Sequence, residues 1–151
     1  MTPLSLDAPD VVEFIGANHR VFLFCRDGAR HPIGYAMRSV AYRSATRCLY
    51  FATYAKSAKV QHLRSSREVA CLIGDDEDWV SVCGLAHVYQ PSAYQPSAAE
   101  VDEIIGKSSP DQRVPESVVA KVRDRLLSGK RCFIGLTLTE VRAADLPDRR
   151  A

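Results

Sequence analysis

The sequence predicts a mostly β fold with short helices, an α+β chain whose six strands are mostly antiparallel and close into a barrel or split barrel. Six segments either alternate apolar and polar residues or form short apolar runs, as strands do. Turn signals separate them at short spacing, and Asp27-Gly28 is a strong hairpin signal. Many short, hairpin-linked strands of this kind are typical of barrels, with the helices expected to cover the open ends.

The elements follow one another closely along the chain. We expect strands over residues 20–26, 31–43, 47–53, 68–74, 79–90 and 132–141, and helices over residues 10–19, 56–64, 98–106 and 115–128. Gly84 lies within a strand, where glycine marks a bulge or a close backbone approach. The expected connections are a solvated acidic turn at 75–78, a PSAYQPS linker at 91–97, a polar KSSPDQR loop at 107–113 and a frayed tail at 143–151. We therefore expect a single domain over residues 1–151, with a helical excursion at 97–129.

Composition is that of an ordinary soluble globular protein, with 46% hydrophobic and 25% charged residues. A net charge of +2 gives no support to nucleic-acid binding. The apolar runs are only strand-sized, so no membrane span is expected. The opening residues MTPLSLDAPD lack the pattern of a secretion signal, so we expect a cytoplasmic location.

The thiols and imidazoles show no metal-site spacing. The five cysteines lie singly in apolar, strand-like segments without a CxxC pair, which favours buried thiols acting as small hydrophobes. The four histidines are scattered along the chain. We therefore expect neither a metal site nor a disulfide framework.

The most informative stretch is residues 47–66, RCLYFATYAKSAKVQHLRSS, a strand that runs directly into a helix. Such a corner exposes unpaired backbone N–H groups, and the helix dipole adds positive potential there. Ser57, Lys59 and Lys56 supply a hydroxyl and two cations at the same place. Together these groups predict a phosphate site without a Gly-rich P-loop. The alternative is a surface helix with solvated lysines.

The same stretch resembles the pyridoxamine 5'-phosphate oxidase-like, FMN-binding split-barrel family. The family has an aromatic-rich strand ending in Thr, then a Ser-Arg-Lys or similar triplet, then a helix with a leucine. The chain has Phe51-Ala52-Thr53, Ser57-Ala58-Lys59 and Leu63 at these positions. The later EVACLIG and WVSVCGLAHV resemble the family's next two strands, so the resemblance covers residues 21–88 and the last strand.

The resemblance implies an FMN-binding oxidoreductase that is a homodimer, with two flavins at the subunit interface and a small-molecule substrate. Ser57 and Lys59 would hold the flavin phosphate, and Thr53 would lie near the ring or the ribityl chain. The strand from Met37 through Ser39 and Val40 to residue 41 would place its backbone along the ring edge. The further implied contacts are Arg38 to the phosphate and Trp79 to the flavin held mainly by the partner chain.

The chain departs from the family pattern at several positions. Ala58 replaces the arginine of the triplet, so Lys56 or Arg38 would supply the missing phosphate contact. Trp79 stands where the oxidases keep a glutamine near the ring. AMRSVAY, residues 36–42, does not reproduce the arginine-and-lysine pattern of the oxidases' second strand, so we do not expect pyridoxamine phosphate as the substrate.

Three further functions remain open. Relatives of this size also bind the deazaflavin coenzyme F-420, and Lys56, Arg64 and Arg67 could bind its anionic tail or could be solvated surface charges. A non-enzymatic protein that carries or senses a flavin is the other possibility, and haem ligation through His87 or His62 is a remoter one. No side chain stands out as a general acid, general base or nucleophile, so the catalytic residues stay unassigned.

Overall fold

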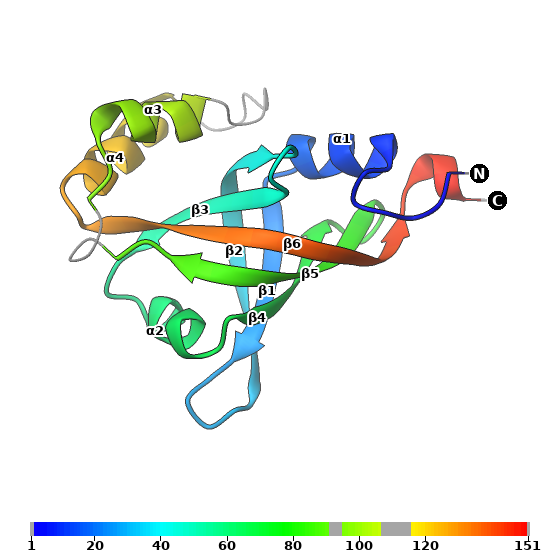
Figure 1. Cartoon of the computed structure of the whole chain (residues 1–151), viewed down its shortest axis with the longest axis horizontal. Coiled ribbons are helices and arrows are strands. Elements are labelled where there is room, and N and C mark those ends of the chain that lie inside the picture. The colour runs from blue at the N-terminus through cyan, green and yellow to red at the C-terminus, as the bar shows by residue number, and fades with distance from the viewer. Residues whose placement is uncertain (1, 91–94, 107–115, 151) are drawn as a thin grey trace.

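The computed structural model describes residues 2–90, 95–106 and 116–150 (Figure 1). In chain order its elements are α1 (Pro9–Ala17), β1 (Arg20–Arg26), β2 (Pro32–Arg43), β3 (Cys48–Tyr54), α2 (Ala58–Ser65), β4 (Glu68–Gly74), β5 (Trp79–Val88), α3 (Ala98–Gly106), α4 (Glu116–Leu127), β6 (Arg131–Asp145) and a 3-10 turn, η1 (Pro147–Arg149). Parts of the predicted linker 91–97 and all of the predicted loop 107–113 lie outside the described residues. None of the described helices is long and apolar enough to cross a membrane.

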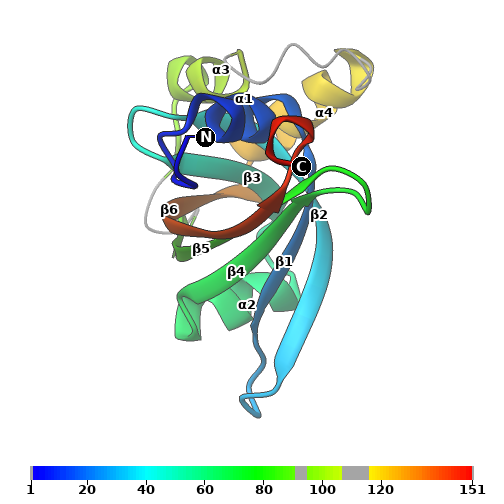
Figure 2. The ribbon, with the colours of Figure 1, turned by 90° about the vertical axis from the view of Figure 1, so that its right-hand side faces the viewer.

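The six strands form a closed antiparallel barrel in the order β1-β2-β3-β6-β5-β4, which confirms the predicted fold (Figures 1 and 2). Asp27-Gly28 begins the β1–β2 hairpin as predicted. The turn is longer than the dipeptide alone suggests, because the Asp27 carboxylate accepts hydrogen bonds from the backbone N–H groups of Ala29 and His31. The left-handed residue of this turn is Arg30, with φ 67°. Gly84 is predicted correctly as a bulge, since the register between β5 and β6 shifts next to it.

The barrel is split between β2 and β3. Their ladder covers only Ser39 to Arg43 on β2, and a bulge at Val40 interrupts it. The first half of β2, from Pro32 to Arg38, is hydrogen-bonded to β1 alone. This leaves an open strand edge on the side where β3 ends.

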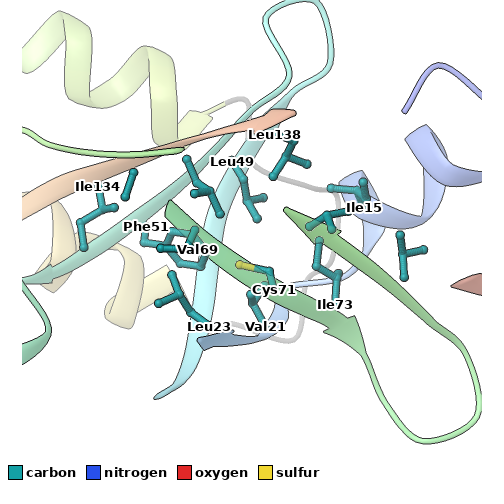
Figure 3. Packing of buried hydrophobic residues seen from close by; sticks show 14 of the residues in the cluster. Ile15, Val21, Leu23, Leu49, Phe51, Val69, Cys71, Ile73, Ile134 and Leu138 are labelled. Atoms are coloured by element: carbon teal, nitrogen blue, oxygen red, sulfur yellow. The ribbon is translucent and has the colours of Figure 1, made fainter. Parts of the chain in front are cut away.

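Helices α1 and α2 lie at opposite ends of the barrel (Figures 1 and 2). Each inserts two apolar side chains into the main core, Val11 and Ile15 from α1 and Val60 and Leu63 from α2. Inward-facing strand residues, including Leu23, Phe51 and Ile73, fill the interior between them (Figure 3). This packing agrees with the predicted alternation, because almost all the strand residues that point into the core occupy alternate positions along their strands.

The other two helices cover the outer face of β3 and β6. Val101 of α3 and Leu126 of α4 are buried against Phe133 of β6. This satellite cluster explains why β3 and the start of β6 are apolar on both faces, with Cys48 to Phe51 all buried. The predicted helical excursion at 97–129 is therefore an additional layer on one side of the barrel.

The end of the chain differs from the expected frayed tail. β6 continues to Asp145, and η1 follows it. Arg149 pairs with Asp10 of α1 at 2.7 Å, and Arg150 pairs with Asp145 at 2.7 Å and with Asp78. These ion pairs fix the tail to α1 and to the 75–78 turn. The polar sequence ADLPDRRA gave no sign of the pairs with Asp10 and Asp78 because these two partners lie far away along the chain.

Candidate functional site

The corner between β3 and α2 is built by backbone hydrogen bonds. The N–H of Ser57 donates to the carbonyl of Tyr54 at 3.0 Å, which closes a tight turn at the end of β3. The N–H of Ala55 donates to the carbonyl of Lys130 at 3.0 Å and ties the turn to the start of β6. α2 then begins at Ala58, two residues later than the sequence predicts. The corner is therefore rigidly attached to the barrel.

Ser57 occupies the N-cap of α2 without capping it. Its backbone is extended, as an N-cap requires, but its side chain makes no cap hydrogen bond. The hydroxyl oxygen is buried and has no hydrogen-bond partner among the described residues. The N–H groups of the first turn thus lack a side-chain acceptor, and the helix dipole concentrates positive potential at the same place. An orphaned hydroxyl beside free N–H groups suits an anionic ligand.

Two lysines flank this helix start. Lys56 is exposed and precedes the first turn. Lys59 leans over β2, with its ammonium 5.8 Å from the centre of the Tyr35 ring. The hydroxyl of Tyr35 is 2.8 Å from Nδ1 of His62, one turn further along α2. Lys59 therefore lies between the helix start and the open edge of β2.

Two arginines that the sequence analysis missed complete the corner. The guanidinium of Arg131 lies 4.2 Å from the centre of the Tyr54 ring, and that of Arg125 lies 5.7 Å from it. Arg125 also donates to the Tyr54 hydroxyl at 2.9 Å. Neither arginine has an ion pair within the described ranges 2–90, 95–106 and 116–150. No local signal identifies them, because they come from α4 and β6, about 70 residues further along the chain.

The β2 segment that should lie along a ring edge is only partly available. Met37 faces the core opposite Val21, and the Ser39 N–H is already bonded to the His19 carbonyl at 2.9 Å. Val40 is the bulged residue, and its side chain packs against the buried cluster of Ala41, Cys48 and Tyr50. The Ser39 pairing fixes the alternation of the β1–β2 ladder, so the backbone groups of Arg38, Ala36 and Gly34 point to the open edge. The free backbone of β2 therefore lies nearer the hairpin than the resemblance implies.

Three other predicted residues lie apart from the corner or turn away from it. Thr53 is 3% exposed and faces the barrel interior, opposite Cys132. Arg38 and Trp79 lie near α1, where Trp79 pairs with Gly74 at the far end of β4. β4 starts just after α2 and is seven residues long, so this end is about 20 Å from α2. Within one chain the structure groups Ser57, Ala58, Lys56 and Lys59 and leaves Arg38 and Trp79 elsewhere.

A buried polar cluster beneath α3 is unsuited to acid–base work. Arg43 forms an ion pair with Glu103 of α3 at 3.2 Å and lies 5.5 Å from the Tyr50 ring centre. Burial raises the pKa of Tyr50 to about 12, and burial also raises the pKa of the Cys48 thiol. Both groups are therefore neutral at pH 7 and covered by the helix. Elsewhere, no group of three or more metal-ligating side chains occurs in the part of the chain that the structure describes.

Comparisons with known proteins extend the fold assignment. No family model matches the sequence. No curated protein matches it either. Solved structures do match across most of the chain. A protein of the pyridoxinephosphate oxidase family from Clostridium acetobutylicum, related to general stress protein 26, is 10% identical, with a TM-score of 0.60 over 84% of this chain and 80% of its own.

Two more matches carry different functions in their names. The haem storage protein HutZ from Vibrio cholerae is 11% identical, with a TM-score of 0.66 over 90% of this chain and 93% of its own. An F420 reductase is 16% identical, with a TM-score of 0.56 over 86% of this chain and 94% of its own. The chain therefore has the split-barrel fold of the pyridoxamine 5'-phosphate oxidase-like proteins. At these identities the likeness establishes the fold, and function must be argued from the site.

Proposed function

We propose that this chain is a flavin-dependent oxidoreductase that binds FMN at the β3–α2 corner of a homodimer and exchanges hydride or electrons with a small molecule. The observation that carries the proposal is the orphaned Ser57 hydroxyl at the uncapped start of α2. A buried hydroxyl without a partner costs about 1–3 kcal/mol, which a ligand acceptor would recover. A phosphate oxygen is the acceptor that this hydroxyl and the adjacent N–H groups lack.

The residues of the β3–α2 corner would each make a different contact with a phosphorylated flavin. Ser57 and the backbone N–H of Ala58 are hydrogen-bond donors to the phosphate, and Lys56 and Lys59 supply charge. The open edge of β2 offers backbone donors and acceptors for a polar ring edge. FMN itself would supply the redox chemistry. The protein's contribution is then binding, orientation and shielding, in agreement with the lack of an obvious acid, base or nucleophile.

A second copy of the chain would complete this site. Within one chain Trp79 lies at the α1 end of the barrel, and the Arg38 side chain lines a cavity there with Asn18 and Gly74, so they would reach the flavin if a partner supplies them. The outer face of β1, β2, β4 and β5 has no described helix over it (Figure 2). It exposes Phe24 and Leu85, which are 44% and 40% exposed. An uncovered apolar face of this kind is typical of a protein–protein interface.

A deazaflavin coenzyme is the second candidate, and a specific observation favours it. Arg125 and Arg131 add two guanidinium groups beside Lys56 and Lys130, without carboxylate partners among the described residues. This is more positive charge than a single phosphate requires. The F420 reductase among the structural relatives makes F-420, with its longer anionic tail, the natural comparison.

The experiment is an absorbance spectrum of the purified protein, followed by titration with FMN and F-420. A bound flavin that NADH or NADPH reduces supports the oxidoreductase. A flavin that neither donor reduces favours a carrier or sensor, and a protein that binds neither coenzyme overturns the proposal. Sedimentation tests the dimer: wild type should be a dimer that Phe24→Asp weakens, whereas a clean wild-type monomer at micromolar concentration contradicts an interfacial site. The expected cytoplasmic location is a separate prediction that imaging of the tagged protein would check.

A further inference from the structure

A polar cavity of about 270 Å³ lies at the α1 end of the barrel, away from the β3–α2 corner. It is lined by Asn18, Arg20, Arg38, Gly74 and Asp75. Gly74 shapes its wall, with φ at 113° and so little space that an added Cβ would lie 2.2 Å from the Asp78 carbonyl oxygen. The cavity is thus formed by the start of β1, the middle of β2 and the end of β4, which the barrel holds in place.

The two arginines of this cavity stand directly opposite each other. The register pairs Arg20 with Arg38, and the neighbouring His19–Ser39 pair is joined by a backbone hydrogen bond at 2.9 Å. Antiparallel pairs alternate, so Arg20 and Arg38 form a non-hydrogen-bonded pair, in which the Cα atoms are only about 4.5 Å apart. Like charges directly opposite one another destabilise a sheet. A ligand placed between them would remove this repulsion.

Within the described ranges, one carboxylate, that of Asp75, lines the cavity with these two arginines. Arg20 and Arg38 have no ion pair and no side-chain hydrogen bond there. Hydrogen bonds from the N–H groups of Asp78 and Glu77 to Oδ1 of Asp75, at 2.9 and 2.8 Å, and the charge of Arg20 lower the pKa of Asp75. Its single negative charge offsets one of the two guanidinium charges. Asp78, next along the same turn, is paired with Arg150. The cavity therefore keeps an excess of positive charge.

We propose that this cavity binds the anionic group of a small molecule, a carboxylate or a phosphate monoester, between the guanidinium groups of Arg20 and Arg38. Planar, multiply donating guanidinium groups are the side chains best suited to such oxyanions. Asn18 adds an amide at the rim. Within one chain the site is separate from the proposed flavin phosphate site. In the proposed dimer Arg38 would also face the partner's flavin, so the use of the cavity as the substrate's anionic subsite rests on the proposed function.

The test follows the fluorescence of the single tryptophan in cofactor-free protein, because Trp79 pairs with Gly74 of the cavity. Sodium phosphate and sodium succinate are titrated separately, with sodium chloride at matched ionic strength as the reference. A saturable change with either probe, absent with chloride, is expected, and the stronger probe identifies the preferred oxyanion. Arg20→Gln and Arg38→Gln should each weaken binding about 10- to 100-fold, as expected for one charge-assisted contact.

Arg26→Gln is the matched control, since it removes the same charge from the same outer face of β1 at its other end. It should leave the affinity unchanged. An equal loss of anion affinity in all three variants would mean that net positive charge alone attracts the anion, and this would overturn the proposal. The proposal would also be overturned if Lys59→Ala alone lost phosphate binding, because the anion would then occupy the β3–α2 corner.

Two further measurements keep the result independent of variant folding and of the proposed function. In wild type, phosphate should protect Arg20 and Arg38, but not Arg26, from modification by phenylglyoxal, as mapped by mass spectrometry. Uniform protection or none contradicts the site. FMN affinity should be unchanged in Arg20→Gln, so the anion cavity and the flavin site can fail separately.

Discussion

Replacing Ser57 with alanine should move stability and cofactor affinity in opposite directions. An N-cap serine normally stabilises its helix, and its loss costs about 1 kcal/mol. Here the side chain makes no cap hydrogen bond, and its hydroxyl is buried without a partner. Removing an unsatisfied buried hydroxyl relieves a penalty of about 1–3 kcal/mol. Ser57→Ala should therefore raise the free energy of unfolding of the cofactor-free protein by about 1 kcal/mol, or about 2–4 °C in Tm.

The same substitution should weaken FMN binding. The lost contact is a hydrogen bond to a charged phosphate, worth about 1.5–3 kcal/mol. This corresponds to a 10- to 100-fold increase in Kd. The assays are urea denaturation of the cofactor-free protein and a fluorescence titration with FMN. Ser66→Ala, at the other end of α2, is the control and should change neither quantity. A destabilised Ser57→Ala protein with unchanged FMN affinity would contradict a phosphate site here, because Ser57 would then be an ordinary helix cap.

Three further substitutions test other parts of the account. Lys59→Ala should weaken FMN about 10- to 100-fold by the loss of one charged contact and leave riboflavin, which lacks the phosphate, unaffected; an equal loss for both would move the phosphate elsewhere. Gly74→Ala should lower the free energy of unfolding by more than about 1 kcal/mol, because φ is 113° and the new Cβ would lie 2.2 Å from the Asp78 carbonyl oxygen; a Tm equal to wild type would contradict this geometry. The hydrogen bond from Arg149 holds the pKa of Asp10 below its usual range in the folded protein. The stability that this pair contributes is therefore fully present above the unfolded pKa of Asp10, about 3.9, and is lost as the pH falls through the lower pKa of the folded protein. Wild type should be more stable than Arg149→Gln at pH 7, and urea melts should show this difference shrink below about pH 4; a difference independent of pH would argue against the pair.

The barrel was predictable because its signals are local. Strand alternation, the Asp27-Gly28 turn and the bulge at Gly84 each arise from a few neighbouring residues, and the structure has all three. The helix after β3 was also predictable, since Val60 and Leu63 have helical spacing and both are buried. Its first residue was placed two positions too early, because Lys56 and Ser57 are compatible with either the turn or the helix.

The composition of the candidate site was only partly predictable. Ser57 and Lys59 are neighbours in sequence, so their meeting at the helix start follows from the local corner. Arg125 and Arg131 reach Tyr54 through the packing of α4 on the barrel, which no local pattern reveals. The family resemblance implied that Arg38 contacts the phosphate, yet alternation turns its side chain outward, opposite Arg20.

The C-terminal tail is a second feature that local sequence does not reveal. Short polar segments at a chain end usually fray, because they bury little apolar surface. Here Arg149 and Arg150 find carboxylates on α1, β6 and the 75–78 turn. Those partners are brought together only once the barrel has closed, so their effect on the tail cannot be derived from the tail itself.

The most direct test of the flavin proposal compares the affinities of wild-type protein for FMN and for riboflavin, measured by fluorescence titration under one set of conditions. The two ligands differ by the phosphate alone, so the ratio isolates what the β3–α2 corner contributes. We expect FMN to bind at least about tenfold more tightly than riboflavin. Equal affinities would contradict it, because the uncapped helix start and the Ser57 hydroxyl would then hold no phosphate.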